Sequence, residues 1–98
     1  MKDIRFVVFH SPGPRWKVGA PIFEQEGIQA HLAHYRAWLE QGKLQAGGPF
    51  LDAQAGGMMV PVAGLSEAEI VGFAQADPAV VAGLLHATVR QWLVGMTQ

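Results

Sequence analysis

The sequence predicts an α+β domain of the ferredoxin-like kind, a βαββαβ antiparallel sheet with two helices on one face. The first observation is the order of periodic segments, strand, helix, strand, strand, helix, strand, within 98 residues. The second is the length, which fits one domain over residues 1–98. The third is that the strand-like segments are apolar on both faces, so a second copy is expected to cover the open face of the sheet.

The first strand is expected from Ile4 to His10, because apolar side chains alternate onto both of its faces. The stretch "SPGPRWKVGAP" that follows holds three prolines and two glycines and is expected to be a loop. Long loops in small domains are often functional. Trp16 in this loop is therefore a candidate lid over a ligand, although packing against the domain is the commoner role for such a side chain.

The first helix is expected from Glu24 to Gln41, with Gly42 as its stop. One stripe of this helix carries the apolar residues Ile28, Leu32, Tyr35 and Leu39.

A second strand is expected from Lys43 to Phe50, interrupted by "GGP", and "DAQAGG" is then a turn. A third strand is expected from Met58 to Ala63, where Pro61 weakens the pattern because proline donates no ladder hydrogen bond.

Ser66 and Glu69 form a capping-box pattern that opens a second helix, expected to reach Gln75. The dipeptide "DP" at Asp77 ends this helix. The last strand is expected from Leu84 to Val94.

Composition excludes several classes of function. The formal net charge is -1 and no basic block occurs, which argues against nucleic-acid binding. Cysteine is absent, so disulfides, thiolate metal sites and cysteine nucleophiles are excluded. The start "MKDIRFVVFH" is too short and charged for a signal peptide, and no apolar run reaches spanning length. We therefore expect a cytoplasmic protein that does not enter a membrane.

Two histidines, His31 and His34, lie three residues apart in the first helix. At 100° per residue, His31 lies roughly 70° from the centre of the apolar stripe and His34 roughly 130° from it. His31 is expected at the half-buried margin, and His34 toward solvent or a subunit interface. A catalytic metal usually needs three protein ligands, and no carboxylate lies one turn away on the right face. No metal site is expected, and the pattern assigns no role to His10 or His86.

Asp77 has two interpretations. Asp is a favoured N-cap, and Pro78 at the first helical position is pre-organised for a short following turn, so the spacing alone favours a cap. A carboxylate can also orient a histidine and stabilise its protonated form. Both roles can coexist, because an ionised carboxylate has several acceptor positions.

The stretch "AGGPF", Ala46 to Phe50, lacks the lysine and hydroxyl residue of a phosphate loop. It is expected to mark a bend, or a close backbone approach to a ligand or to the neighbouring helix. In the last strand Arg90 shares a face with Trp92, so it is expected to pair with a carboxylate or to meet an anionic ligand. Serine nucleophile chemistry has little support, since Ser66 is used as a cap.

The chain resembles the YCII-related (YciI-like) family over nearly its whole length. The resemblance is carried by "PGPRW", "EQEG", "AHL", "EQGKLQAGGPFLD", "GGMM", "QADPAVVAGL" and "TVRQWLV" in this order. It implies a dimeric α/β barrel with a His–Asp pair in a pocket. The family histidine precedes the glycine after the first helix by eleven residues, which selects His31 before Gly42, and the aspartate of the "DP" dipeptide is Asp77.

The resemblance also places Gly48 and Pro49 in the pocket lining, and nothing carries over to His34. Where relatives have an assigned activity, it is a cofactor-independent elimination, the dehydrochlorination of a hydroxylated aromatic. We therefore expect a lyase-like enzyme in which His31 is the general base or acid and Asp77 orients it. Arg90 and backbone amides near Gly48 would hold an enolate or phenolate.

No cofactor is expected. The partners expected are a small-molecule ligand, which Trp16 would help to bind, and further copies of the chain, as a homodimer or higher oligomer. The alternative is a non-catalytic small-molecule-binding or regulatory dimer with the same pocket. A cofactor-free oxygenase ranks lowest, because the fold alone suggests it.

Overall fold

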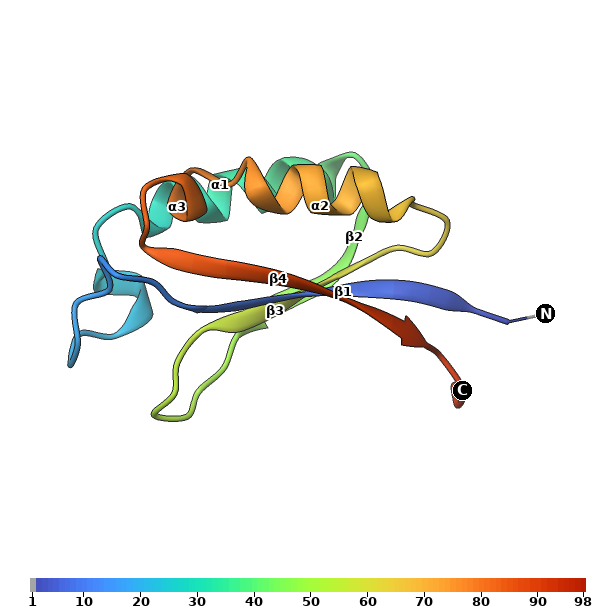
Figure 1. Cartoon of the computed structure of the whole chain (residues 1–98), viewed down its shortest axis with the longest axis horizontal. Coiled ribbons are helices and arrows are strands. Elements are labelled where there is room, and N and C mark those ends of the chain that lie inside the picture. Colours follow the sequence, from blue (N-terminus) through green and yellow to red (C-terminus); the bar gives the residue numbers. More distant parts are fainter. Residues whose placement is uncertain (1) are drawn as a thin grey trace.

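A computed structural model describes residues 2–98 (Figure 1). Its elements are β1 (Ile4–Pro12), a 3₁₀ turn η1 (Ile22–Glu24), α1 (Ile28–Glu40), β2 (Leu44–Pro49), β3 (Gly57–Pro61), α2 (Glu67–Gln75), α3 (Pro78–Val81) and β4 (Leu85–Leu93). The strands form one sheet in the order β2-β3-β1-β4, with every neighbouring pair antiparallel. Figure 1 shows the helices together on one face of this sheet. The expected ferredoxin-like α+β fold is confirmed.

The first helix begins later than the apolar pattern predicted. Gly27 adopts a left-handed conformation, φ 93°, immediately before Ile28. The buried side chain of Gln25 is committed to the preceding loop, where its Oε1 accepts from Lys17 N at 2.8 Å and its Nε2 donates to Ala20 O at 2.9 Å. Residues 24–27 therefore belong to the segment before α1, and the prediction that the helix begins at Glu24 was wrong.

The buried stripe of α1 also differs from the expected one. Its buried residues are Ile28, His31, Tyr35 and Trp38, whereas Leu39 is 54% exposed. The indole of Trp38 stacks on Phe73 of α2, with ring centroids 3.8 Å apart, and this large contact sets the rotation of α1. His31 consequently lies in the middle of the buried face and not at its margin.

His34 does not face solvent or a subunit interface as predicted. It is half-buried, and its ring stacks on Phe73 with centroids 3.8 Å apart. Its Nε2 donates to the carbonyl oxygen of Phe73 at 2.7 Å. The side chain therefore joins α1 to α2, which is a structural role.

The glycine-rich segment does not interrupt β2, which continues through Pro49 after a register shift between Leu44 and Ala46. A Cβ at Gly57 in β3 would lie 2.5 Å from the carbonyl oxygen of Gly48 and 2.9 Å from Cα of Pro49. The close backbone approach is thus between the two strands of this hairpin.

Two clusters of buried side chains hold the helices against the sheet. The larger includes Val8, Tyr35 and Ile70 and lies beneath α1 and α2. The smaller includes Ile28 and Leu85, lies near α3, and has Trp16 packed against it. Along the chain His31 falls between Ile28 and Tyr35, so it sits where the two clusters meet.

Both helix-start predictions in the second half are confirmed. Ser66 Oγ accepts from the backbone N–H of Glu69 at 3.1 Å. Asp77 is the N-cap of α3, accepts from the N–H of Ala79 at 2.9 Å, and is followed by proline at the first helical position.

The face of the sheet away from the helices carries several apolar side chains, together with Arg90 and Gln91. A shallow groove there is lined by Val7, Phe9, Met58, Val60, Arg90, Gln91 and Trp92. Within residues 2–98, no helix has the length and apolar character needed to span a bilayer.

Candidate active site

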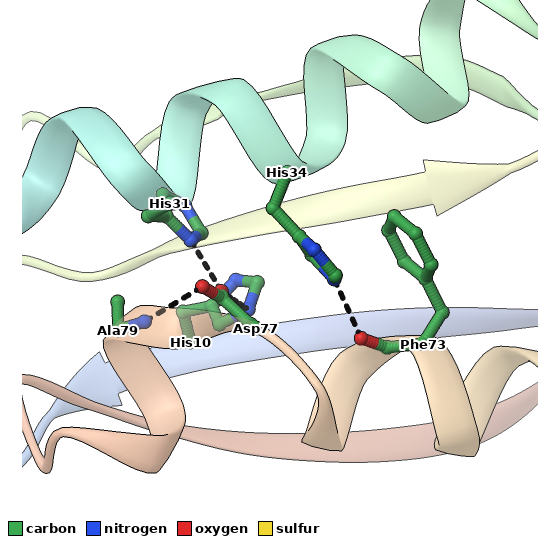
Figure 2. A network of polar contacts seen from close by, with 6 residues as sticks. All are labelled: His10, His31, His34, Phe73, Asp77 and Ala79. Carbon is green, nitrogen blue, oxygen red and sulfur yellow. Dashed lines mark hydrogen bonds and ion pairs between the residues drawn. The ribbon is translucent and has the colours of Figure 1, made fainter.

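His31 and Asp77 meet at the centre of the domain, 46 residues apart in the sequence. Nδ1 of His31 lies 2.5 Å from Oδ2 of Asp77, and the two side chains are 5% and 0% exposed. The helix α1 supplies His31, and the start of α3 supplies Asp77 (Figure 2). Hydrogen bonds in which one partner is ionised, such as an imidazole N–H to a carboxylate, are shorter and stronger than neutral ones.

Asp77 fulfils both of its expected roles with different oxygens. Oδ1 accepts from the N–H of Ala79, and Oδ2 faces His31. Burial works to raise the pKa of Asp77, but the hydrogen bond and charge of His31 outweigh it, helped by the Ala79 N–H, and the pKa lies below its usual value. An ionised carboxylate only accepts, so Nδ1 of His31 is the donor.

His10 of β1 is the third buried polar side chain at this point, and sequence reasoning missed it. Its ring meets that of His31 edge-on, with centroids 4.8 Å apart, and its Nε2 lies 3.8 Å from Oδ2 of Asp77 (Figure 2). Burial, and then repulsion from His31, lower the pKa of His10 to about 4. His10 is therefore neutral at pH 7, and its contact with Asp77 is not an ion pair.

Tyr35 completes the wall of this buried cluster. Its ring lies 5.3 Å from that of His31 and 5.5 Å from that of His10, centroid to centroid. Burial, with a smaller contribution from the charge of Asp77, raises the pKa of Tyr35. The phenol is therefore neutral and unsuited to act as a base near pH 7.

A cavity of about 180 Å³ opens beside the two histidines. Among its lining residues, all within the described part of the chain, His10 and His31 are the ones with polar side-chain groups. The remainder are apolar side chains or proline, with four glycines from the β2–β3 hairpin: Gly47, Gly48, Gly56 and Gly57. Asp77 lies behind His31, out of reach of this cavity's contents.

The structure brings together four of the six residues expected from the sequence. His31, Gly48 and Pro49 line the cavity, and Asp77 holds His31. Trp16 lines a neighbouring groove formed by the long loop and the β2–β3 hairpin. Arg90 lies on the opposite face of the sheet, 5.9 Å from the ring centroid of Phe9, so within one chain the sheet separates it from His31.

His10, His31 and Asp77 are also the residues that could hold a metal ion. Each offers one ligand atom, and the three atoms lie within 4.8 Å of one another. This group differs from the His31–His34 pair considered in the sequence, because His34 is bonded to Phe73.

One sequence signal could have found His10. Strand alternation puts His10 on the same face as Phe6 and Val8, and Val8 belongs to the core beneath the helices. A histidine on the helix-covered face at the end of a strand is therefore expected to be buried beside α1.

Comparison with known proteins identifies the family of the chain. The model of the YCII-related domain family matches residues 6–93. The "Uncharacterized protein YjpA" of Bacillus subtilis (strain 168) is 31% identical over 70 residues, which make up 71% of this chain and 80% of that protein.

Among solved structures, the chain is similar to 5-chloro-2-hydroxyhydroquinone dehydrochlorinase (TftG) from Burkholderia phenoliruptrix AC1100, in complex with 2,5-dihydroxybenzoquinone. The TM-score is 0.67 and the sequence identity 26%, and the match covers 91% of this chain and 92% of that one.

Proposed function

Because the chain belongs to the YCII-related domain family, we propose that it is a small lyase-like enzyme that uses His31 and Asp77 to move a proton on a small ring compound. The observation that carries the proposal is the 2.5 Å contact between His31 Nδ1 and Asp77 Oδ2 beside a cavity. The likeness to a dehydrochlorinase supports the class of reaction.

The pairing assigns a role to each nitrogen of His31. Nδ1 keeps its hydrogen because it donates to Asp77, so Nε2 carries the free lone pair and is the nitrogen left for a ligand in the cavity. When Nε2 takes a proton, the carboxylate stabilises the imidazolium that forms. Proton transfer by such a group typically contributes about 10²–10⁴-fold to the rate.

The cavity indicates the class of substrate. A dry cavity of about 150 Å³ holds one benzene molecule, so about 180 Å³ suits a single substituted ring. Two imidazoles among apolar walls suit hydroxyl or carbonyl groups on that ring. No lysine or arginine of the described chain lines the cavity, which disfavours phosphorylated or multiply carboxylated substrates.

The proposed reaction is the elimination of HX from a hydroxylated ring. His31 Nε2 removes a proton from one hydroxyl group, which becomes a ring carbonyl, and returns it to the ring carbon that carries X. His31 Nε2 then removes the proton of a second hydroxyl group, which becomes the second carbonyl, while a ring double bond shifts to the carbon that carries X and X departs as an anion with its bonding electrons. The proton on His31 then passes to solvent, so the reaction needs no oxidant or reductant.

A homodimer is part of this proposal. The apolar face that includes Phe9, Val60 and Trp92 would be covered by the same face of a second copy. In such an assembly Arg90 would lie between the two sheets. Cytoplasmic location stays a prediction.

The direct experiment supplies halogenated di- and trihydroxybenzenes to the purified chain and measures halide release. We expect turnover by the wild type and a loss of about 10²–10⁴-fold in His31→Gln. His34→Gln is the matched control, because it changes a histidine on the same helix that does not line the cavity. Equal turnover by folded His31→Gln would refute the proposal.

The alternative, a non-catalytic binding or regulatory dimer, gives a different outcome in the same experiment. The chain would then bind 2,5-dihydroxybenzoquinone without releasing halide from any of these compounds. That result would refute the proposed enzyme activity and support the binding or regulatory function.

A further inference from the structure

Nε2 of His10 is buried without a hydrogen-bond partner among residues 2–98. The side chain of His10 is 3% exposed, and its Nε2 faces the fully buried Oδ2 of Asp77 at 3.8 Å (Figure 2). A buried polar atom without a partner costs free energy, so it calls for an explanation such as an ion, a water or a functional role.

The width of this gap selects among those explanations. A hydrogen bond spans about 2.7–3.2 Å, so 3.8 Å is too long for one. A bridging water, with two bonds of about 2.8 Å, normally spans roughly 4.5 Å, so the gap is too short for that. Two ligand atoms that each bind one metal ion at about 2.1 Å lie roughly 3.4 Å apart at the tetrahedral angle, and at most about 4.2 Å apart when the ion lies on the line between them. The 3.8 Å gap fits the ion.

The third ligand atom is Nδ1 of His31. It lies within 4.8 Å of the other two, so movements of about 1 Å would bring all three to bonding distance of one ion. Its separation from Oδ2 of Asp77 would widen from 2.5 Å, and the hydrogen between them would be lost. That hydrogen moves to Nε2 of the same ring, so His31 stays neutral and changes tautomer.

We propose that His10 Nε2, His31 Nδ1 and Asp77 Oδ2 bind a divalent transition-metal ion of the zinc type. Two imidazoles and one carboxylate are ligands that zinc accepts, whereas magnesium prefers sites made of oxygen. Three protein ligands leave a fourth position for water or another small ligand.

The bound ion switches off proton transfer by His31. The ion occupies Nδ1 and the hydrogen occupies Nε2, so no lone pair is left to act as a base. This inhibition rests on the proposed function, whereas the metal site itself does not.

The test uses the full chain, freed of metal by a chelator and then dialysed. Titration with Zn²⁺, followed by calorimetry, is expected to saturate at one ion per chain, and Co²⁺ to develop the visible absorption of a tetrahedral site. His10→Gln should weaken the affinity for Zn²⁺ by at least about 100-fold. His86→Gln, the same change at an exposed histidine of β4, should leave it unaltered. Mg²⁺ should not bind.

Equal Zn²⁺ affinity of His10→Gln and the wild type would overturn the proposal, as would the absence of stoichiometric binding by the wild type. If His10→Gln does not fold, NMR spectra of the histidine rings of the wild type, recorded with and without Zn²⁺, test the metal site instead. One equivalent of Zn²⁺ should displace the ring signals of His10 and His31 but not those of His86, and the reverse pattern refutes the site. Neither readout involves turnover, so failure of the metal site leaves the proposed reaction standing.

Discussion

Removing the imidazole of His10 should abolish a defined part of the acid sensitivity of the fold. Burial, with repulsion from His31, lowers the pKa of His10 from 6.5 to about 4. The unfolded chain therefore binds a proton in a range of pH where the folded chain does not. Stability rises with pH wherever the unfolded state holds more protons, so it falls as the pH drops from about 6.5 to about 4.

The size of this effect follows from the shift in pKa. At about 1.4 kcal/mol per pKa unit, a lowering from 6.5 to about 4 corresponds to roughly 3 kcal/mol of folding free energy. The full penalty is present below the folded pKa and absent above the unfolded one. Asp77 affects stability in a separate, lower pH range. Its pKa in the folded chain lies below the usual value of 3.8, so the ionised carboxylate stabilises the fold above about pH 3.8, and this contribution is lost as the pH falls further.

Urea denaturation between pH 4 and pH 7.5, in buffer that contains a chelator, measures the effect. The free energy of unfolding of the wild type should fall by roughly 3 kcal/mol more over this range than that of His10→Gln. His86→Gln, at an exposed position, should keep the slope of the wild type. If His10→Gln shows the wild-type slope, the assignment of a neutral, buried His10 is wrong.

Three further substitutions test other contacts. His34→Leu removes the 2.7 Å bond to Phe73 O and should cost about 1 kcal/mol in urea denaturation with turnover unchanged, so a loss of turnover would contradict its structural role. Asp77→Ala removes the helix cap as well as the bond to His31, whereas Asp77→Asn keeps a capping side chain, so the Ala variant should be about 1 kcal/mol less stable than the Asn variant. Both variants should lose catalysis, and equal stability of the two would show that the cap contributes nothing. Val60→Glu on the open sheet face should give monomers by light scattering, whereas the control Val18→Glu, at a 92% exposed loop position, should leave the dimer intact. A dimeric Val60→Glu variant would exclude this face as the interface.

The fold was accessible from the sequence because its signals are local. The element order, the Ser66 cap and the Asp77 cap each depend on residues within one or two turns, and all agree with the structure. The start of α1 was not accessible, because Gln25 is drawn into hydrogen bonds with Lys17 and Ala20 that only the folded loop provides.

The site depended on contacts between distant segments. Periodicity placed His31 at the margin of α1, since the rotation of that helix is set by the stacking of Trp38 on Phe73. The partnership of His31 with Asp77 came from family spacing, not from geometry. Alternation correctly grouped Arg90 with Trp92, but it does not tell which face of the sheet the helices cover.

In the proposed mechanism, Asp77 holds the hydrogen on Nδ1 of His31 and so leaves Nε2 free as a base. Nitrogen-15 NMR of the imidazole groups in the metal-free chain at neutral pH tests it without any substrate. We predict a protonated Nδ1 and a bare Nε2 for His31 in the wild type, and loss of this preference in Asp77→Asn. A hydrogen on Nε2 with a bare Nδ1 in the wild type would contradict the claim.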